Sequence, residues 1–234
     1  MKNMKTLDKI LNESSHTNRF AKNYFFAATV FIVVFCTILH AANVDSSFFI
    51  GTSSYEIHEA RNLSQVIYVS SELFLRSLMH SNWQHALLNM LCFLVVGSYL
   101  ERKMGSVRLF LSLIVVIIIS SWASRMWARF FVGFSGVNFA LYAIVIVDYV
   151  FVLLDKGRTK QRLIYGGIVV ALIYFAMCFS GGTQAISFRW YPYDLVNHGG
   201  HAAGFLAGFV IYISYKVLGV FFEAKTSQHN KAAQ

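Results

Sequence analysis

The chain has 234 residues, of which 56% are hydrophobic and only 13% are charged, and its formal net charge is +9 at pH 7. Soluble domains carry about 25% charged residues, so the composition excludes an ordinary soluble globular protein and indicates an integral membrane protein. Basic cytoplasmic segments beside anionic lipid explain the positive charge. No nucleic-acid-binding motif accompanies it, so we expect membrane lipid, and no nucleic acid, as a partner.

Six segments are apolar enough to be membrane spans, each of which needs about 20 mostly apolar residues. The first could instead be a signal peptide, but its length and the hydrophilic stretch before it favour an uncleaved anchor. The sequence therefore predicts an all-α membrane protein with six transmembrane helices. These are expected at Tyr24–Ala42, Trp83–Leu100, Leu109–Trp127, Ser135–Leu154, Leu163–Phe179 and Gly200–Phe222.

The distribution of Lys and Arg predicts the orientation of these spans. With the N-terminus inside, the inner segments hold 15 of the 20 Lys and Arg residues. We therefore expect a cytoplasmic N-terminal segment at 1–23, a six-span domain at 24–222 and a cytoplasmic tail at 223–234. The long outer segment 43–82 is expected to be irregular and to fold onto the membrane surface.

Polar residues inside apolar segments are the first candidates for function. His85 and Asn89 lie four residues apart, so a helix places them on one face. Ser135 opens the fourth segment between Gly133 and Gly136, which permit a sharp turn and a close approach of another chain. Simpler explanations are a hydrogen bond between helices for the first pair and an N-cap for the serine.

His201 opens the sixth segment, in the stretch NHGGHAAGFLAG. Gly200, Gly204 and Gly208 recur every four residues and give one helix face on which a neighbour can pack closely. We expect this face to pack against the helix that begins at Ser135, which would bring the serine hydroxyl to the imidazole. A serine needs such a base to become a nucleophile at neutral pH.

The polar groups of these segments lie at the same end, which predicts acyl transfer to Ser135 followed by hydrolysis just below the outer membrane surface. His85, Asn89 and backbone N–H groups could stabilise the oxyanion. Asp148 cannot complete a triad, because 13 helical residues put it about 20 Å from Ser135 and a triad acid must contact the histidine. We expect Asp148 near the cytoplasmic headgroups.

The motifs HSNWQHALLN, GFSGVNFAL and GGHAAGFLAG, in this order, resemble those of the rhomboid family of intramembrane serine proteases. The resemblance covers the six-span layout and about residues 72–215. A further match is GSYLERKMG, in which Gly97, Glu101 and Gly105 follow one another in four-residue steps. Each motif is weak alone, whereas their combination is specific.

The resemblance implies a rhomboid-like bundle with a catalytic dyad, Ser135 as nucleophile and His201 as general base, and neither a cofactor nor a metal. His85, Asn89 and the Ser135 N–H would form the oxyanion hole. The implied substrates are single-span membrane proteins cut near the outer face of a bacterial inner membrane. Structural support is expected from the other motif residues: His80, Gly97, Glu101, Gly105, Gly133, Gly136, Phe139, Gly204 and Gly208.

Two positions depart from the family pattern. The family commonly has a tyrosine four residues after the nucleophile, stacked on the catalytic histidine, and here that residue is Phe139. A phenyl ring can still stack, but without the hydroxyl we expect looser orientation of His201 and lower activity. The family's Trp–Arg pair, which precedes the first histidine of this motif, is also absent, and the stretch SSELFLRSLMH offers only Arg76, out of place. Asn138 has no assigned role, and His198 is expected to be an exposed loop residue.

Three alternatives belong to other classes. A non-catalytic rhomboid-like protein would bind transmembrane helices without cutting them, and the Phe139 departure slightly favours it. A metal-dependent membrane enzyme would use several of the histidines, but no HExxH helix is present in the sequence. A channel or carrier is disfavoured because the sequence has no internal repeat.

Overall fold

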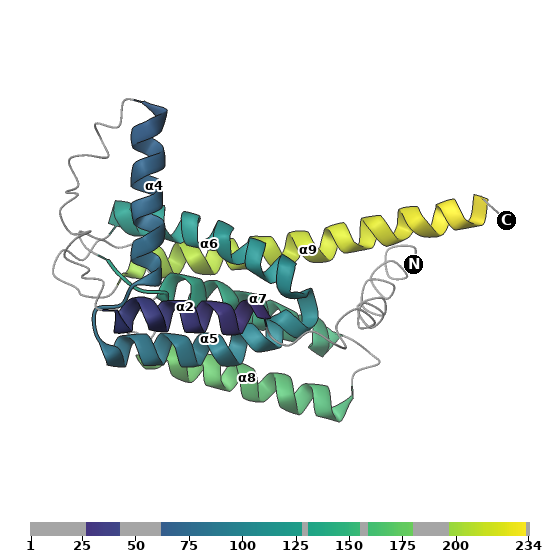
Figure 1. Cartoon of the computed structure of the whole chain (residues 1–234). Coiled ribbons are helices and arrows are strands. Elements are labelled where there is room, and N and C mark those ends of the chain that lie inside the picture. The colour runs from purple at the N-terminus through teal and green to yellow at the C-terminus, as the bar shows by residue number, and fades with distance from the viewer. Residues whose placement is uncertain (1–26, 43–61, 128–130, 155–158, 180–196, 233–234) are drawn as a thin grey trace.

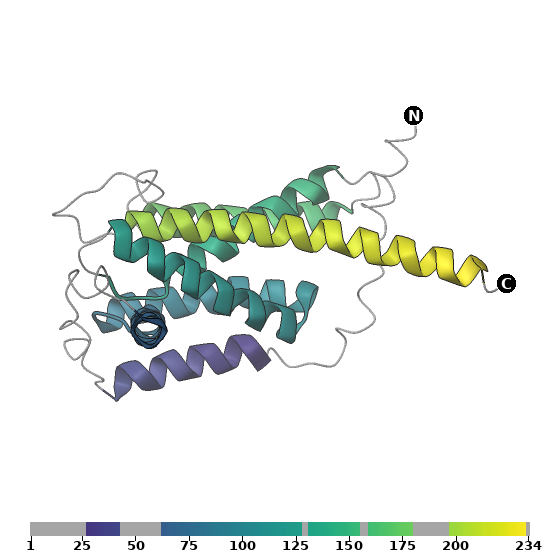
Figure 2. The same cartoon turned by 90° about the horizontal axis from the view of Figure 1, so that it is seen from above.

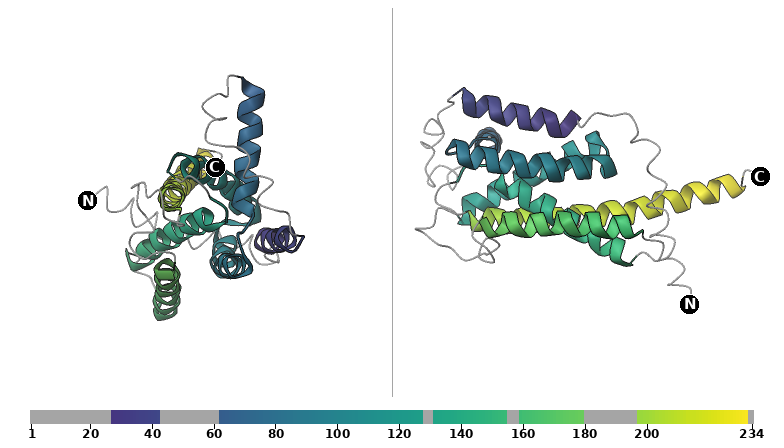
Figure 3. Two further views of the ribbon diagram at one scale, coloured as in Figure 1. Left: turned by 90° about the vertical axis from the view of Figure 1, so that its left-hand side faces the viewer. Right: turned by 90° about the horizontal axis from the view of Figure 1, so that it is seen from below.

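The structure, a computed structural model, describes residues 27–42, 62–127, 131–154, 159–179 and 197–232. Figure 1 shows α4 lying across the direction of the other helices, and the end-on and top views in Figures 2 and 3 agree. Within the described ranges there are seven helices and no strand: α2 (Ala27–Ala41), α4 (Leu63–Leu78), α5 (Trp83–Met104), α6 (Ser106–Trp127), α7 (Ser135–Leu154), α8 (Lys160–Phe179) and α9 (His198–Ala232).

A helix occupies each of the six segments predicted to be spans. Three of these helices, α5, α6 and α7, are long and apolar enough to cross a membrane by length and composition, whereas α2 is a shorter apolar helix of 15 residues. The all-α class is therefore confirmed for the described residues. The crossing of all six helices, the domain limits and the cytoplasmic termini stay predictions.

The last helix, α9, is longer than predicted. It has 35 residues and continues to Ala232, through most of the predicted tail and past Phe222, where the membrane span was expected to end. At 1.5 Å per residue it is about 50 Å long, whereas a bilayer core is about 30 Å thick. Figure 1 shows its C-terminal part extending beyond the other helices.

The outer segment expected to be irregular contains α4, so that prediction is wrong for 63–78. Asn62 caps this helix, and its Oδ1 accepts a hydrogen bond from the Gln65 N–H at 3.0 Å. Val69 and Leu73 are buried on one face, together with the ion pair between Glu72 and Arg76. The apolar residues of this segment nevertheless follow the helical period of an amphipathic helix, so the sequence carried a signal for α4.

α7 is the central helix of the bundle. It contacts α5, α6, α8 and α9, and every residue from Gly136 to Val145 is buried. A helix that is apolar on all sides is buried in a protein core or spans a membrane, and here the neighbouring helices enclose it. Ser135, the first residue of α7, therefore lies at one end of the most enclosed helix, and Asp148 lies towards the other.

Candidate active site

Ser135 follows a turn that only glycine adopts easily. Gly133 has a φ of 118°, in the region where a side chain would strain the backbone. The carbonyl of Phe134 then accepts hydrogen bonds from the N–H groups of Val137 and Asn138, at 3.0 and 3.1 Å, and closes the first turn of α7. The Ser135 side chain is half-buried, so it is held at the helix start without being sealed off.

His201 lies in the first turn of α9 and contacts Ser135. Its Nε2 is 2.7 Å from the Ser135 Oγ, although the two residues are 66 positions apart in the sequence. Phe139, one turn after Ser135 on α7, stacks on the imidazole with ring centroids 4.2 Å apart and planes inclined by 10°. The predicted pairing of hydroxyl and imidazole, and the predicted stacking of a phenyl ring, are both present.

Glycines bring α7 and α9 together, as the spacing predicts. A Cβ on Gly204 would lie inside van der Waals contact of the Gly136 carbonyl, and one on Gly208 would do the same at the Ala140 carbonyl. Both obstacles are backbone atoms, which cannot move aside as a flexible side chain can. The two glycines therefore set the interhelical distance at which His201 reaches Ser135.

Asn197 directly precedes α9, and the sequence analysis did not assign it a role. Its carbonyl accepts the His201 N–H at 3.0 Å, and its Oδ1 accepts the Gly200 N–H at 3.0 Å. Its Nδ2 donates to the Ser124 Oγ of α6 at 2.6 Å. The first turn of α9 is thereby tied to a third helix. The signal in the sequence was an N-cap residue before the predicted helix, but the serine partner is 73 residues away.

His85 packs against the turn that precedes Ser135. A Cβ on Gly133 would lie 2.6 Å from the His85 Cε1 and 2.9 Å from its Nε2. The Ser81 hydroxyl lies 3.1 Å from the other ring nitrogen, Nδ1. Asn82 caps α5, and its Oδ1 accepts the His85 N–H at 2.8 Å. The imidazole is thus fixed beside the nucleophile turn.

Asn89, one turn further along α5, is buried and contacts Asn138 of α7. The Asn138 Nδ2 donates to the backbone carbonyl of Asn89 at 3.1 Å and to its Oδ1 at 3.0 Å. Asn138, which had no assigned role, is therefore the direct partner of a predicted oxyanion-hole residue.

His80 lies between α4 and α5 and is only 5% exposed. Its ring contacts two other imidazoles, with centroids 5.2 Å from His85 and 6.3 Å from His40 of α2. Burial, and to a lesser extent the neighbouring His85 and His40, lowers the pKa of His80 from 6.5 to about 3. Neither ring nitrogen has a hydrogen-bond partner among the described residues, so the neutral ring packs as an apolar group.

Gly97, Glu101 and Gly105 lie on α5 away from Ser135 and attach the start of α2. The Glu101 carboxylate accepts from the N–H groups of Ala28 and Thr29, both at 2.9 Å, and from the Thr29 hydroxyl at 2.6 Å. Thr29 also packs on Gly97, where an added Cβ would lie 3.2 Å from its Oγ1. Gly105 ends α5 with a φ of 83°. None of these contacts involves the dyad residues.

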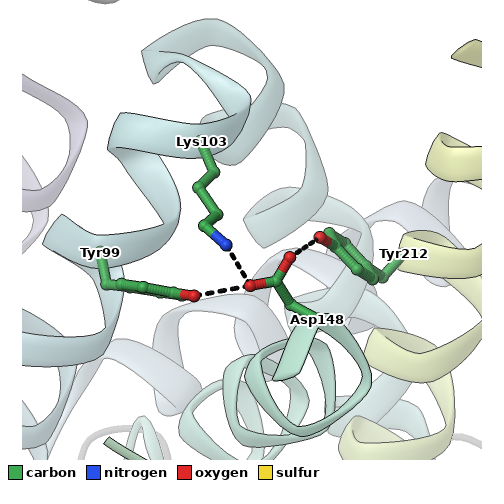
Figure 4. Close-up of polar contacts among 4 residues, drawn as sticks. All are labelled: Tyr99, Lys103, Asp148 and Tyr212. Atoms are coloured by element: carbon green, nitrogen blue, oxygen red, sulfur yellow. Dashed lines mark hydrogen bonds and ion pairs between the residues drawn. The ribbon is translucent and has the colours of Figure 1, made fainter. Parts of the chain in front are cut away.

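Asp148 lies in a buried polar network (Figure 4), and its expected place near the cytoplasmic headgroups stays a prediction. Its side chain is almost fully buried. One carboxylate oxygen accepts from the Tyr99 hydroxyl at 2.6 Å and pairs with Lys103, and the other accepts from the Tyr212 hydroxyl. The network joins α5, α7 and α9, so the exclusion of Asp148 from the dyad agrees with its contacts.

His198 is 5% exposed and belongs to the first turn of α9. The prediction of an exposed loop residue is therefore wrong. Helical spacing puts it one turn before His201, on the same side of α9, which buries it with that residue.

A sequence model described as the Rhomboid domain matches residues 69–216, so the chain belongs to the rhomboid family. It is 29% identical over 135 residues to a protein named rhomboid-like protein 11, chloroplastic, of Arabidopsis thaliana, which covers 56% of this chain and 48% of the relative. It is 28% identical over 139 residues to rhomboid protease GlpG of Salmonella paratyphi A, covering 58% and 45%.

The chain thus spans about half the length of the curated relatives it matches. With its apolar helices, family membership makes it an integral membrane protein.

Proposed function

We propose that this chain is an intramembrane serine endopeptidase in which Ser135 is the nucleophile and His201 the general base. The observation that carries the proposal is the 2.7 Å contact between the Ser135 Oγ and the His201 Nε2. Similarity to proteins named rhomboid protease GlpG supports the same activity. Nucleophile and base within hydrogen-bond reach are the geometric signature of covalent catalysis.

The reaction follows from this geometry. As the Ser135 Oγ attacks the scissile carbonyl carbon, its proton passes to the His201 Nε2 and the carbonyl π electrons move to the oxygen. The tetrahedral species then expels the amine, which takes the proton from His201, and an acyl-enzyme remains. Water, deprotonated by His201, attacks this ester and releases the carboxylic acid and Ser135. The stacked Phe139 keeps the imidazole plane fixed between these steps.

His85, Asn89 and the Ser135 N–H are the proposed oxyanion donors. The first four N–H groups of a helix lack intrahelical partners, and Ser135 is the first residue of α7. The His85 ring lies against Gly133, and Asn89 lies one turn deeper on the same helix. Donors fixed before the reaction stabilise the developing charge without reorganisation.

Single-span membrane proteins are the proposed substrates, with cleavage near the outer face of a bacterial inner membrane. His85, Ser135 and His201 are all close to the first residues of their helices, which supports a site near one membrane surface. The excess of Lys and Arg in the opposite segments supports a cytoplasmic location for the other end.

The deciding experiment reconstitutes wild type, Ser135→Ala and His201→Ala in liposomes and follows cleavage of a single-span model substrate, with a chelator in parallel. We expect cleavage by wild type alone, unaffected by chelator, and a fall in kcat of about 10⁴-fold or more for either variant. Equal cleavage by all three would remove both residues from the mechanism.

Absence of cleavage by any of them would favour a non-catalytic protein that binds transmembrane helices. Labelling of Ser135 by a fluorophosphonate would then distinguish an unsuitable substrate from an inactive protein.

A further inference from the structure

Asn138 makes a contact that the proposed dyad does not require. It is the fourth residue of α7, is 2% exposed, and its side chain crosses to α5. There the Nδ2 donates to two oxygens of the same residue, the backbone carbonyl and the side-chain Oδ1 of Asn89. Among the described residues no hydrogen-bond partner reaches the Asn138 Oδ1.

The backbone carbonyl determines how both amides are oriented. A carbonyl oxygen only accepts hydrogen bonds, so the atom of Asn138 that faces it must be the NH₂ group. The same NH₂ group faces the Asn89 side chain, so the Asn89 atom opposite it must be the acceptor, Oδ1. Neither amide can be reversed without placing two acceptors or two donors against each other.

The consequence is that the Asn89 Nδ2 is turned away from Asn138. It is buried and has no hydrogen-bond partner among the described residues. A buried donor without a partner is costly, and each such group in a native protein calls for an explanation, of which a catalytic role is one. If the pair served only to hold the helices together, a better arrangement would satisfy all four amide groups.

We propose that Asn138 is a positioning residue that orients Asn89, so that the Asn89 NH₂ group is presented as a donor to the oxyanion. This inference rests on the proposed function and extends it to a residue outside the dyad and the oxyanion hole. Asn138 does not touch the substrate. It acts by excluding the Asn89 orientation in which an oxygen would face the developing negative charge.

Two substitutions separate orientation from packing. Asn138→Asp has nearly the same shape but, when its carboxylate is ionised, carries only acceptors, so the Asn89 amide turns its NH₂ group towards the new carboxylate. We expect kcat to fall about 100-fold, as when an oxyanion donor is removed, with KM unchanged within about twofold. Asn138→Leu removes the hydrogen bond that orients the Asn89 amide but does not favour the opposite orientation. Asn89 can then adopt either orientation, and kcat should fall only about two- to fivefold.

The control is Ser121→Ala on α6, which removes a buried hydroxyl contact of 2.6 Å with Ser77 and does not touch Asn89. All rates are divided by the concentration of sites that a fluorophosphonate labels at completion, which corrects for misfolded protein. A purely structural role for Asn138 predicts that both of its variants resemble Ser121→Ala, with kcat per labelled site unchanged, and that result would overturn the proposal.

The second readout is a double-mutant cycle with Asn89→Ala. If Asn138 acts through Asn89, Asn138→Asp lowers kcat no further once Asn89 has become alanine. An additive loss of another 100-fold would overturn the proposal even though the wild type is active. Should Asn138→Asp not fold, Asn138→Leu enters the same cycle with its smaller expected loss. A wild type that neither cleaves nor labels would instead overturn the proposed function and this inference together.

Discussion

The two ends of the bundle differ in how fully their buried polar groups are hydrogen-bonded. At the end that carries Ser135, hydrogen-bonding capacity is left over, because the Asn89 Nδ2 and both nitrogens of His80 have no partner among the described residues. At the end that carries Asp148, a single carboxylate accepts from two tyrosines and pairs with Lys103 (Figure 4).

The same three helices, α5, α7 and α9, supply residues to both ends. The difference teaches that a buried polar group serves stability where it is saturated, and is available for chemistry where it is not. Substitutions in the Asp148 network should therefore change mainly the free energy of unfolding, and substitutions of the dyad and of the residues that position it should change mainly the rate.

Gly204→Ala should have the largest effect, because it moves α7 away from α9 and so disturbs the contacts between these helices at both ends of the bundle. The added methyl group meets the backbone carbonyl of Gly136, so α7 and α9 must move apart. Overpacking costs about 1–3 kcal/mol and sometimes more, and a displacement of about 1 Å at a catalytic contact lowers the rate about 100-fold. Thermal unfolding in detergent measures the loss of stability, and the cleavage rate measures the loss of activity.

Gly167→Ala in α8 is the matched control, because the nearest obstacle to its methyl group is the end of the Tyr149 side chain, 3.3 Å away. We expect both quantities to stay near the wild-type values. Equal losses in the two variants would mean that the helices tolerate alanine alike and that Gly204 has no special role.

Asp148→Ala should lower stability and leave the chemistry intact. It removes the shared acceptor of Tyr99, Lys103 and Tyr212, and loss of one member of a buried charge pair costs about 3–5 kcal/mol. Because the Lys103 side chain is 36% exposed and can be hydrated, we expect about 2 kcal/mol. The rate per fluorophosphonate-labelled site should stay within about twofold of wild type, and a large loss of rate without loss of stability would contradict the division between the two ends.

His80 should make stability depend on pH at the Ser135 end. Its folded-state pKa is about 3, against 6.5 for an ordinary histidine, so the unfolded chain binds the proton first as the pH falls. The contribution of His80 to the free energy of unfolding is therefore complete above about pH 6.5. Below that pH it declines, by about 2 kcal/mol between pH 7.5 and pH 5. Urea unfolding of wild type and His80→Met at both pH values measures this contribution, together with the electrostatic effect of His80 on its neighbours His85 and His40. Equal pH slopes for both proteins would show that His80 is protonated in the folded state.

Sequence reasoning predicted those features that depend on local patterns. Apolar length identified the helices, four-residue glycine spacing predicted the contact of α7 with α9, and the motif order led to Ser135 and His201. It failed where the partner came from a distant part of the chain. The buried network around Asp148 was not predicted, because its tyrosine partners are 49 and 64 residues away in the sequence.

The role of Asn138 was missed for the same reason. Asn138 faces Asn89 across 49 residues, and its position beside the nucleophile did not reveal on which helix its partner would lie. The segment of α4 was expected to be irregular although its apolar residues follow the helical period and its buried ion pair joins residues only four positions apart, Glu72 and Arg76.

The smallest effect is expected at the ring that stacks on His201. Phe139→Leu keeps the site apolar but removes the stack, and an aromatic pair contributes about 0.5–1.5 kcal/mol beyond its buried area, so kcat should fall about three- to tenfold. Phe139→Tyr restores the family's residue and keeps the stack. Because Phe139 is only 1% exposed, the new hydroxyl must find a partner, and we expect a change in kcat of less than about threefold. A gain well above threefold for Phe139→Tyr would mean that the hydroxyl, and not the stacked ring, is what orients His201 in this family.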